Sequence, residues 1–147
     1  MIMSLAALSA VTALAAANTV PATRIGQSDH AVTLQQLAPP ECAAIAAGLT
    51  SLIVGSDGDD GNNLILGSAG TDTIRGRRGS DCIVGGGGDD VLNGDQDDDV
   101  LVGGPGNDTL NGDQQNDTLN GGPDTDTCAG GAGTDTATTC ETISGVP

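Results

Sequence analysis

Residues 58–138 read GDDGNNLIL, GSAGTDTIR, GRRGSDCIV, GGGGDDVLN, GDQDDDVLV, GGPGNDTLN, GDQQNDTLN, GGPDTDTCA and GGAGTDTAT when the chain is divided into blocks of nine. The nine blocks follow one another without an insertion or a deletion. The first position is glycine in every block, and the fourth is glycine in six. The sixth is Asn63 in the first block and aspartate in the other eight, and the eighth is Ile, Leu, Cys or Ala. This fixed period predicts a stack of similar small units.

Each conserved column of the repeat has a physical reason. Glycine at positions one and four permits left-handed backbone and lets main-chain carbonyls approach an ion closely. Aspartate at position six supplies a hard anionic oxygen. The apolar residue at position eight predicts a very short strand, in which this middle side chain points to one face and its two neighbours point to the other. Because such a short strand is not stable alone, the blocks must stack into a solenoid of parallel rungs.

The residue at position two shows that the structural period is 18 rather than nine. In the even-numbered blocks this residue is small: Ser68, Gly86, Gly104 and Gly122. In the third, fifth and seventh blocks it is charged: Arg77, Asp95 and Asp113. Blocks an even number apart are therefore expected on the same side of the solenoid.

The blocks resemble the G-G-x-G-x-D-x-U-x nonapeptide of RTX calcium-binding repeat proteins of the secreted bacterial type. The resemblance covers 81 of the 147 residues. It implies that the first six residues of each block form a calcium-binding turn and the last three a strand. Two blocks would make one coil, so that the nine repeats form an all-β, right-handed parallel β-roll with 18 residues per coil and a small cap at each end.

The side chains at position six are the predicted metal ligands, and they form two ladders. One ladder contains Asp72, Asp90, Asp108 and Asp126, and the other contains Asn63, Asp81, Asp99, Asp117 and Asp135. Glycines of the same turns complete the predicted sites: Gly67, Gly70, Gly85, Gly88, Gly103 and Gly106. The repeat region contains 16 aspartates and three arginines, a formal charge of −13, which about seven calcium ions between the coils would nearly cancel.

Affinity is expected to differ among these sites. The ladder through Asp72, Asp90 and Asp108 should bind calcium most tightly. Weaker sites are expected where the pattern changes, at Asn63, Arg77, Arg78, Asp97, Gln115 and Asp124. Because stacked carboxylates repel one another, we expect the chain to be expanded without calcium and folded with it.

The flanking segments predict export and end caps. Residues 1–17 have no charged residue and end in Ala15-Ala16-Ala17, which is typical of a signal peptide and predicts an extracellular protein. Residues 18–57 are predicted to form an N-terminal linker and cap, with a short helix over 41–47 and a strand over 49–54. Residues 139–147 are predicted to form a C-terminal cap.

The four cysteines predict a disulfide framework, for which three pairings are possible. Their positions favour Cys42 with Cys82 and Cys128 with Cys140. These two bridges would cover the end rungs of the roll, where unpaired strand edges invite aggregation.

Composition excludes several other functions. A formal charge of −16 with four Lys plus Arg residues leaves no basic patch for nucleic acid, and no membrane insertion is predicted for the mature chain. The single histidine, His30, has no motif around it, so the sequence predicts no enzyme. The alternative is calcium-dependent surface recognition, adhesion or ice binding, by rows of Thr and Asn such as Thr71-Thr73 and Asn107-Thr109. The protein or surface partner is left open.

Overall fold

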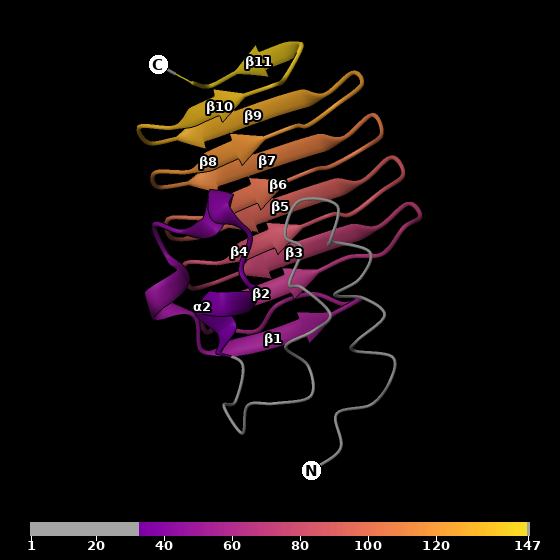
Figure 1. Ribbon diagram of the computed structural model, residues 1–147. Helices are drawn as coiled ribbons and strands as arrows, with labels where there is room; N and C mark the ends of the chain where they lie inside the picture. The colour runs from indigo at the N-terminus through magenta and orange to yellow at the C-terminus, as the bar shows by residue number, and fades with distance from the viewer. Residues whose placement is uncertain (1–32, 147) are drawn as a thin grey trace.

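Short strands from successive blocks alternate between two parallel sheets that together form a β-solenoid (Figure 1). The computed structural model describes residues 33–146, so the predicted signal peptide, His30 and the linker up to residue 32 lie outside the described residues. Sheet A contains, in spatial order, β1 (Ser51–Val54), β2 (Asn63–Leu66), β4 (Cys82–Val84), β6 (Val100–Val102), β8 (Thr118–Asn120) and β10 (Thr136–Thr138). Sheet B contains β3 (Thr73–Arg77), β5 (Val91–Asp95), β7 (Thr109–Gln114), β9 (Thr127–Ala132) and β11 (Thr142–Ser144). The all-β solenoid prediction is confirmed.

The strand register confirms the 18-residue coil. In sheet A Ile83 lies opposite Leu101, and in sheet B Leu92 lies opposite Leu110. Both sheets also continue past the nine blocks. At the start, β1 pairs with β2 at a spacing of 12 residues, and at the end β11 pairs with β9 at a spacing of 15.

The interior of the solenoid is one column of apolar side chains from position eight. The column contains Ile65, Ile74, Ile83, Leu92, Leu101, Leu110, Leu119 and Cys128, each at most 1% exposed. Burial of each large aliphatic side chain contributes roughly 1.5–3 kcal/mol. The alternation along each short strand therefore directs position eight inward and positions seven and nine outward.

The N-terminal cap consists of short turns. It contains α2 (Leu34–Leu37), η2 (Pro40–Cys42) and η3 (Ala46–Gly48), followed by β1 where a strand was predicted. The predicted helix over 41–47 is wrong, because a segment this short needs tertiary packing to stay helical and the packing here selects two separate 3-10 turns. None of the helices in residues 33–146 is long and apolar enough to cross a membrane.

The cap packs against the outer face of sheet A (Figure 1). Cys42 and Ala46 are buried there, against outward-facing residues of β2, β4 and β6. These outward residues are Leu64, Leu66, Cys82, Val84 and Val100. Sheet A thus has apolar side chains on both faces in its first coils, and the cap covers the outer one.

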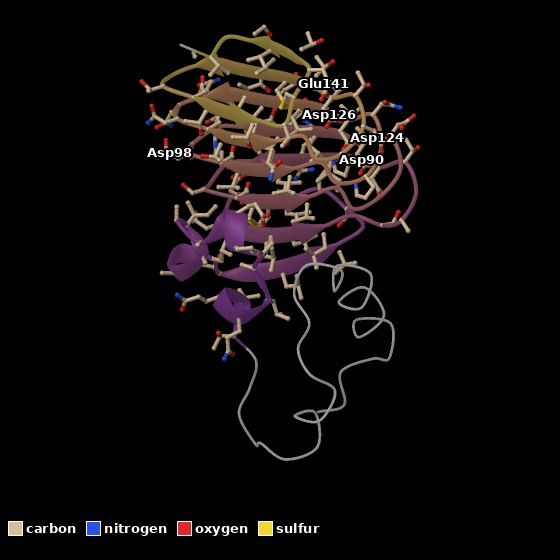
Figure 2. All side chains as sticks on the ribbon, turned by 45° about the horizontal axis from the view of Figure 1, so that its top comes forward. Asp90, Asp98, Asp124, Asp126 and Glu141 are labelled. Atoms are coloured by element: carbon tan, nitrogen blue, oxygen red, sulfur yellow. A yellow bond between two sulfur atoms is a disulfide. The ribbon has the colours of Figure 1, made fainter. Side chains whose placement is uncertain are left out.

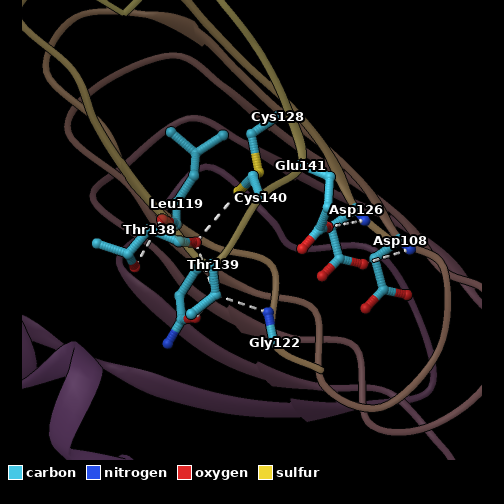
Figure 3. The surroundings of a disulfide bond; sticks show 10 residues. Asp108, Leu119, Gly122, Asp126, Cys128, Thr138, Thr139, Cys140 and Glu141 are labelled. Carbon is cyan, nitrogen blue, oxygen red and sulfur yellow. Dashed lines mark hydrogen bonds between the residues drawn. A yellow bond between two sulfur atoms is a disulfide. The ribbon is translucent and has the colours of Figure 1, made fainter. Parts of the chain in front are cut away.

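Both predicted disulfides are present. Cys42 and Cys82 have Cα atoms 5.8 Å apart, and those of Cys128 and Cys140 are 6.0 Å apart. The second bridge closes the C-terminal end of the interior column, as predicted (Figure 3). The first bridge does not cover an end rung, since Cys82 faces outward from β4 and the bridge ties the cap to the outer face of sheet A.

Candidate metal sites

The two predicted ladders lie on opposite sides of the solenoid, in the turns that lead into each strand. Figure 2 shows Asp90, Asp126 and Glu141 on one side and Asp98, from a turn of the other ladder, on the opposite side. The position-six side chains are buried even though the turns are at the surface: Asn63, Asp81, Asp90, Asp99, Asp108, Asp117, Asp126 and Asp135 are 0–3% exposed. Asp72 is half-buried.

One oxygen of each buried aspartate is used to join the coils. Oδ1 of Asp90 accepts the backbone N–H of Asp72 at 2.8 Å, and Oδ1 of Asp108 accepts that of Asp90 at 2.8 Å. The same bond runs along the other ladder, where Oδ1 of Asp99 accepts the N–H of Asp81 at 2.8 Å. Each aspartate therefore stabilises the turn one coil before its own.

The second oxygen of these aspartates has no partner among the residues that the structure describes. Oδ2 accepts no hydrogen bond from any residue in the described part of the chain at Asp81, Asp90, Asp99, Asp108, Asp117, Asp126 and Asp135. A buried polar group left unpaired costs about 1–3 kcal/mol, and a charged one more. Seven such oxygens in one small fold indicate that something besides the protein neutralises them.

Burial changes the protonation of these carboxyl groups. It raises the pKa of Asp99 to about 8, those of Asp81 and Asp117 to about 7, and that of Asp90 to about 6. Burial also raises the pKa of Asp108. Burial therefore disfavours the charged form at these positions relative to an exposed carboxylate, and a cation beside each one would favour it again.

Glycine at position one creates a cradle beside each unpaired oxygen. A Cβ placed on Gly76 would lie 2.5 Å from Asp81 Oδ2 and 2.8 Å from the carbonyl oxygen of Gly94, one coil further. The carboxylate and the next coil's carbonyl thus converge on the space that a side chain would fill. Left-handed backbone is not the reason for this column, because positive φ occurs at positions two and four instead, as at Gly86 and Gly88.

The donors in these cradles suit a hard cation. No group of three or more His, Cys, Asp or Glu side chains converges anywhere in residues 33–146, so a cation here would take its remaining ligands from main-chain oxygens and water. Calcium takes six to eight oxygen ligands in flexible geometry, and a mixture of carboxylate, carbonyl and water is typical of its sites. The residues present therefore fit calcium.

The comparison with family models agrees with this geometry. A model described as the RTX calcium-binding nonapeptide repeat matches residues 57–92, 79–110 and 102–137. The chain belongs to the RTX family. Comparisons with curated proteins and with solved structures found no match. The RTX repeats therefore form a calcium-binding module built on a β-solenoid.

The first position of each RTX ladder differs from those that follow. Asp72 Oδ2 accepts hydrogen bonds from the backbone N–H and hydroxyl of Ser68, at 2.7 and 2.8 Å. Asn63 accepts the N–H of Asp59 at 2.9 Å and donates to the Ser51 hydroxyl at 2.7 Å. Oδ2 of Asp72 and the side-chain amide of Asn63 are thus bonded to protein groups, so the argument for metal rests on the seven later positions. Position two of the second block, Ser68, was not singled out for this role in the sequence.

The RTX turns that depart from the repeat pattern contain strained backbone. Six non-glycine residues at positions two and four have φ between 75° and 86°: Arg77, Asp95, Asp97, Asp113, Gln115 and Asp124. Left-handed backbone costs a residue with a Cβ about 1 kcal/mol or more. This strain agrees in direction with weaker binding in these turns, which stays a prediction.

The three arginines of the RTX repeats pair with aspartates of neighbouring turns. Arg75 makes two bonds to Asp95, the shorter at 2.8 Å, and Arg77 and Arg78 lie 3.5 and 3.4 Å from acidic partners. All three arginine side chains are more than half exposed, so each pair contributes about 0–1 kcal/mol. They offset part of the acidic charge at the N-terminal coils.

One residue outside the RTX repeats joins a ladder. Glu141 Oε2 accepts the backbone N–H of Asp126 at 2.6 Å, which is the bond that an aspartate one coil further makes elsewhere. Glu141 follows Asp126 by 15 residues instead of 18, so the periodicity gave no signal for it.

Proposed function

We propose that this chain is a secreted, non-enzymatic structural module whose solenoid folds as calcium binds between the coils. The observation that carries the proposal is the set of seven buried carboxylate oxygens that have no partner within residues 33–146. Each lies beside a glycine cradle, as Asp81 Oδ2 lies beside Gly76. About seven calcium ions, one beside each of these oxygens, would satisfy them all.

Folding and calcium binding are linked in this proposal. Without cations the buried carboxylates must either protonate or remain charged without a partner, and both disfavour the compact state near neutral pH. A ligand that binds only the folded chain adds RT ln(1 + [L]/Kd) per site to stability, about 1.4 kcal/mol for each site at tenfold excess over its Kd. Several weak sites together are therefore enough to decide whether the solenoid forms.

An extracellular location is supported by the two disulfides. Such bridges persist in oxidising compartments and are rare where thiols are kept reduced. The apolar segment of residues 1–17 is the expected export signal. Extracellular calcium-binding modules have Kd values of about 0.1–1 mM, so calcium near a millimolar would be enough to occupy such sites.

The test is circular dichroism of the chain from Asn18 with intact disulfides, during parallel titrations with calcium and magnesium after treatment with a chelator. We expect a cooperative gain of β signal with calcium at concentrations where magnesium has little effect. A chain that is already fully folded in excess chelator would contradict the coupling. A chain that stays disordered in about 10 mM calcium would contradict the ligand role of the ladders.

Two neighbouring aspartates provide a matched pair of variants. Asp99 is buried with an unpaired Oδ2, whereas the exposed Asp98 uses Oδ1 to accept the N–H of Asn116. Asp99→Asn and Asp98→Asn remove the same charge from adjacent positions. We expect the calcium midpoint to rise about threefold or more for Asp99→Asn and to change little for Asp98→Asn, because ligand charge tunes calcium affinity. Equal shifts would show that only net charge matters.

Surface recognition by Thr rows remains the alternative, and one observation favours it. Thr73, Thr109, Thr127 and Thr142 share an outward column of sheet B, and neighbouring Asn111 donates to Asn93 Oδ1 at 2.9 Å. Val91 interrupts the column, and the cap covers part of sheet A, so this proposal has less support. Thermal hysteresis of the calcium-loaded protein would test its ice-binding form.

A further inference from the structure

The last aspartate of each ladder has no following repeat. In the inner coils three groups meet at each cradle: a position-one glycine, Oδ2 of the aspartate in the same turn, and the carbonyl oxygen of the glycine one coil further. Asp126 and Asp135 lie in the last two blocks, so the repeats contain no third group for them. Both are nevertheless buried, at 0% and 3% exposure, with an unpaired Oδ2.

The C-terminal cap supplies the missing group at Asp126. A Cβ on Gly121 would lie 2.5 Å from Asp126 Oδ2 and 2.7 Å from the carbonyl oxygen of Thr139. Thr139 follows Gly121 by 18 residues, the spacing of one coil. Its hydroxyl accepts the N–H of Gly122 at 2.9 Å, which holds the backbone of Thr139 against this turn.

Glu141 supplies the charge that the next aspartate would have brought. Asp126 donates its N–H to Glu141 at 2.6 Å, as Asp108 donates to Asp126 Oδ1 at 2.8 Å. Figure 3 shows Asp108, Asp126 and Glu141 in one row beside the disulfide. Glu141 follows Asp126 by 15 residues instead of 18, and its longer side chain still reaches the Asp126 N–H.

The other ladder ends in the same way. A Cβ on Gly130 would lie 2.6 Å from Asp135 Oδ2 and 2.7 Å from the carbonyl oxygen of Gly145. Gly145 belongs to the segment after β11 and has φ of 63°. Two non-repeat carbonyls therefore occupy the places that position-one glycines occupy in the inner coils.

We propose that the C-terminal cap completes the last calcium site of each ladder. The Thr139 carbonyl oxygen would be a ligand at Asp126, where Glu141 is a positioning residue and an added negative charge, and the Gly145 carbonyl oxygen would be a ligand at Asp135. The inference rests on the proposed calcium function of the repeats. It assigns a metal-binding role to a segment outside the repeat pattern.

The chain offers a matched test, because Glu41 and Glu141 are its two glutamates. Glu141→Gln keeps an oxygen that can accept the Asp126 N–H and removes the charge, and Glu41→Gln makes the same change at an exposed position of the N-terminal cap. Bound calcium is measured by equilibrium dialysis of the disulfide-intact full chain over a range of free calcium. We expect one site to weaken roughly tenfold in Glu141→Gln, with the other sites and the whole Glu41→Gln profile unchanged.

Other results would overturn the inference. Identical binding profiles for the two variants would contradict a site at Glu141, and an equal loss at every site in Glu141→Gln would show that the cap acts only on general stability. A wild-type chain that binds no calcium would instead refute the proposed function.

A measurement on the wild-type chain covers the case in which Glu141→Gln does not fold. Carbonyl ¹³C resonances of the folded, calcium-saturated chain are compared by NMR with those after calcium is exchanged for the trivalent, diamagnetic lanthanum ion, and those of Thr139 and Gly145 should shift as much as that of Gly103. The Ser144 carbonyl serves as the control. Shifts of Thr139 and Gly145 no larger than that of Ser144 would overturn the proposal.

Discussion

An alanine at Gly85 should damage the solenoid, whereas the same change at Gly87 should not. The two glycines lie two residues apart in one turn, and neither has positive φ. A Cβ on Gly85 would lie well under 3.0 Å from Asp90 Oδ2 and 2.9 Å from the carbonyl oxygen of Gly103. A Cβ on Gly87 would have no neighbour closer than 3.9 Å.

The magnitude follows from what the new Cβ displaces. Overpacking of a filled site costs about 1–3 kcal/mol. The Asp90 carboxylate cannot move without weakening its 2.8 Å bond to the Asp72 N–H, and a hydrogen bond to a charged group contributes about 1.5–3 kcal/mol. We therefore expect Gly85→Ala to lower the free energy of unfolding by about 2.5–6 kcal/mol, the sum of the two contributions. Gly87→Ala should raise the free energy of unfolding by about 0.4–1 kcal/mol, because alanine reduces the conformational entropy of the unfolded chain.

The assay is urea unfolding followed by far-UV circular dichroism in saturating calcium, together with the calcium midpoint of each variant. Gly85→Ala should show a lower unfolding midpoint and a higher calcium midpoint than wild type. If both alanine variants unfold at the same urea concentration, the cradle beside Asp90 is not filled or not tight. If Gly85→Ala binds calcium like wild type, that space is not part of a metal site.

Two other perturbations test the ladders and the core. In excess chelator the folded-state pKa values of Asp81 and Asp117, about 7, and of Asp99, about 8, lie above the usual value near 3.8, so protonation stabilises the metal-free solenoid fully below about pH 4 and this contribution is lost as pH rises through 7–8. Far-UV circular dichroism in chelator should thus show less β signal at about pH 8.5 than at about pH 5.5, and the reverse order would contradict buried ladders. In the core, Leu101→Ala should lower the free energy of unfolding by about 2–5 kcal/mol in the urea assay with saturating calcium, because Leu101 is 0% exposed. Val54→Ala, at a 48% exposed position, should lower it far less. Similar losses in the two variants would argue against the interior column.

The repeating part of the structure could be predicted from the sequence because its contacts repeat with the chain. Each coil pairs with the coil 18 residues away, so an unbroken nine-residue period specifies strand positions, sheet register and the inward column of Ile83 and Leu101 together. The same period aligns Asp90 with Asp108, whose spacing makes one carboxylate accept the previous coil's N–H. The pairing of the four cysteines could also be predicted. Position eight placed Cys128 at the end of the interior column near Cys140, which left Cys42 to pair with Cys82.

The ends of the solenoid could not be predicted in this way, because their contacts follow no period. The N-terminal cap lies on a surface that exists only once β2, β4 and β6 have stacked, although the paired apolar residues at positions seven and nine, such as Leu64 and Leu66, were a readable signal. Glu141 reaches Asp126 through a shorter chain path and a longer side chain, which no spacing rule describes.

The sequence by itself determined the repeating part of this protein: the period, the 18-residue coil, the two ladders and the kind of cation that hard oxygen ligands prefer. Tertiary structure decided which groups pair with the first and last positions of each ladder. Hydrogen bonds to Ser68 and Asp59 satisfy the first ladder positions, and cap residues face the last ones. The physical reason is that burial and pairing of an individual oxygen depend on which groups lie beside it in space, and at the ends these come from outside the repeat.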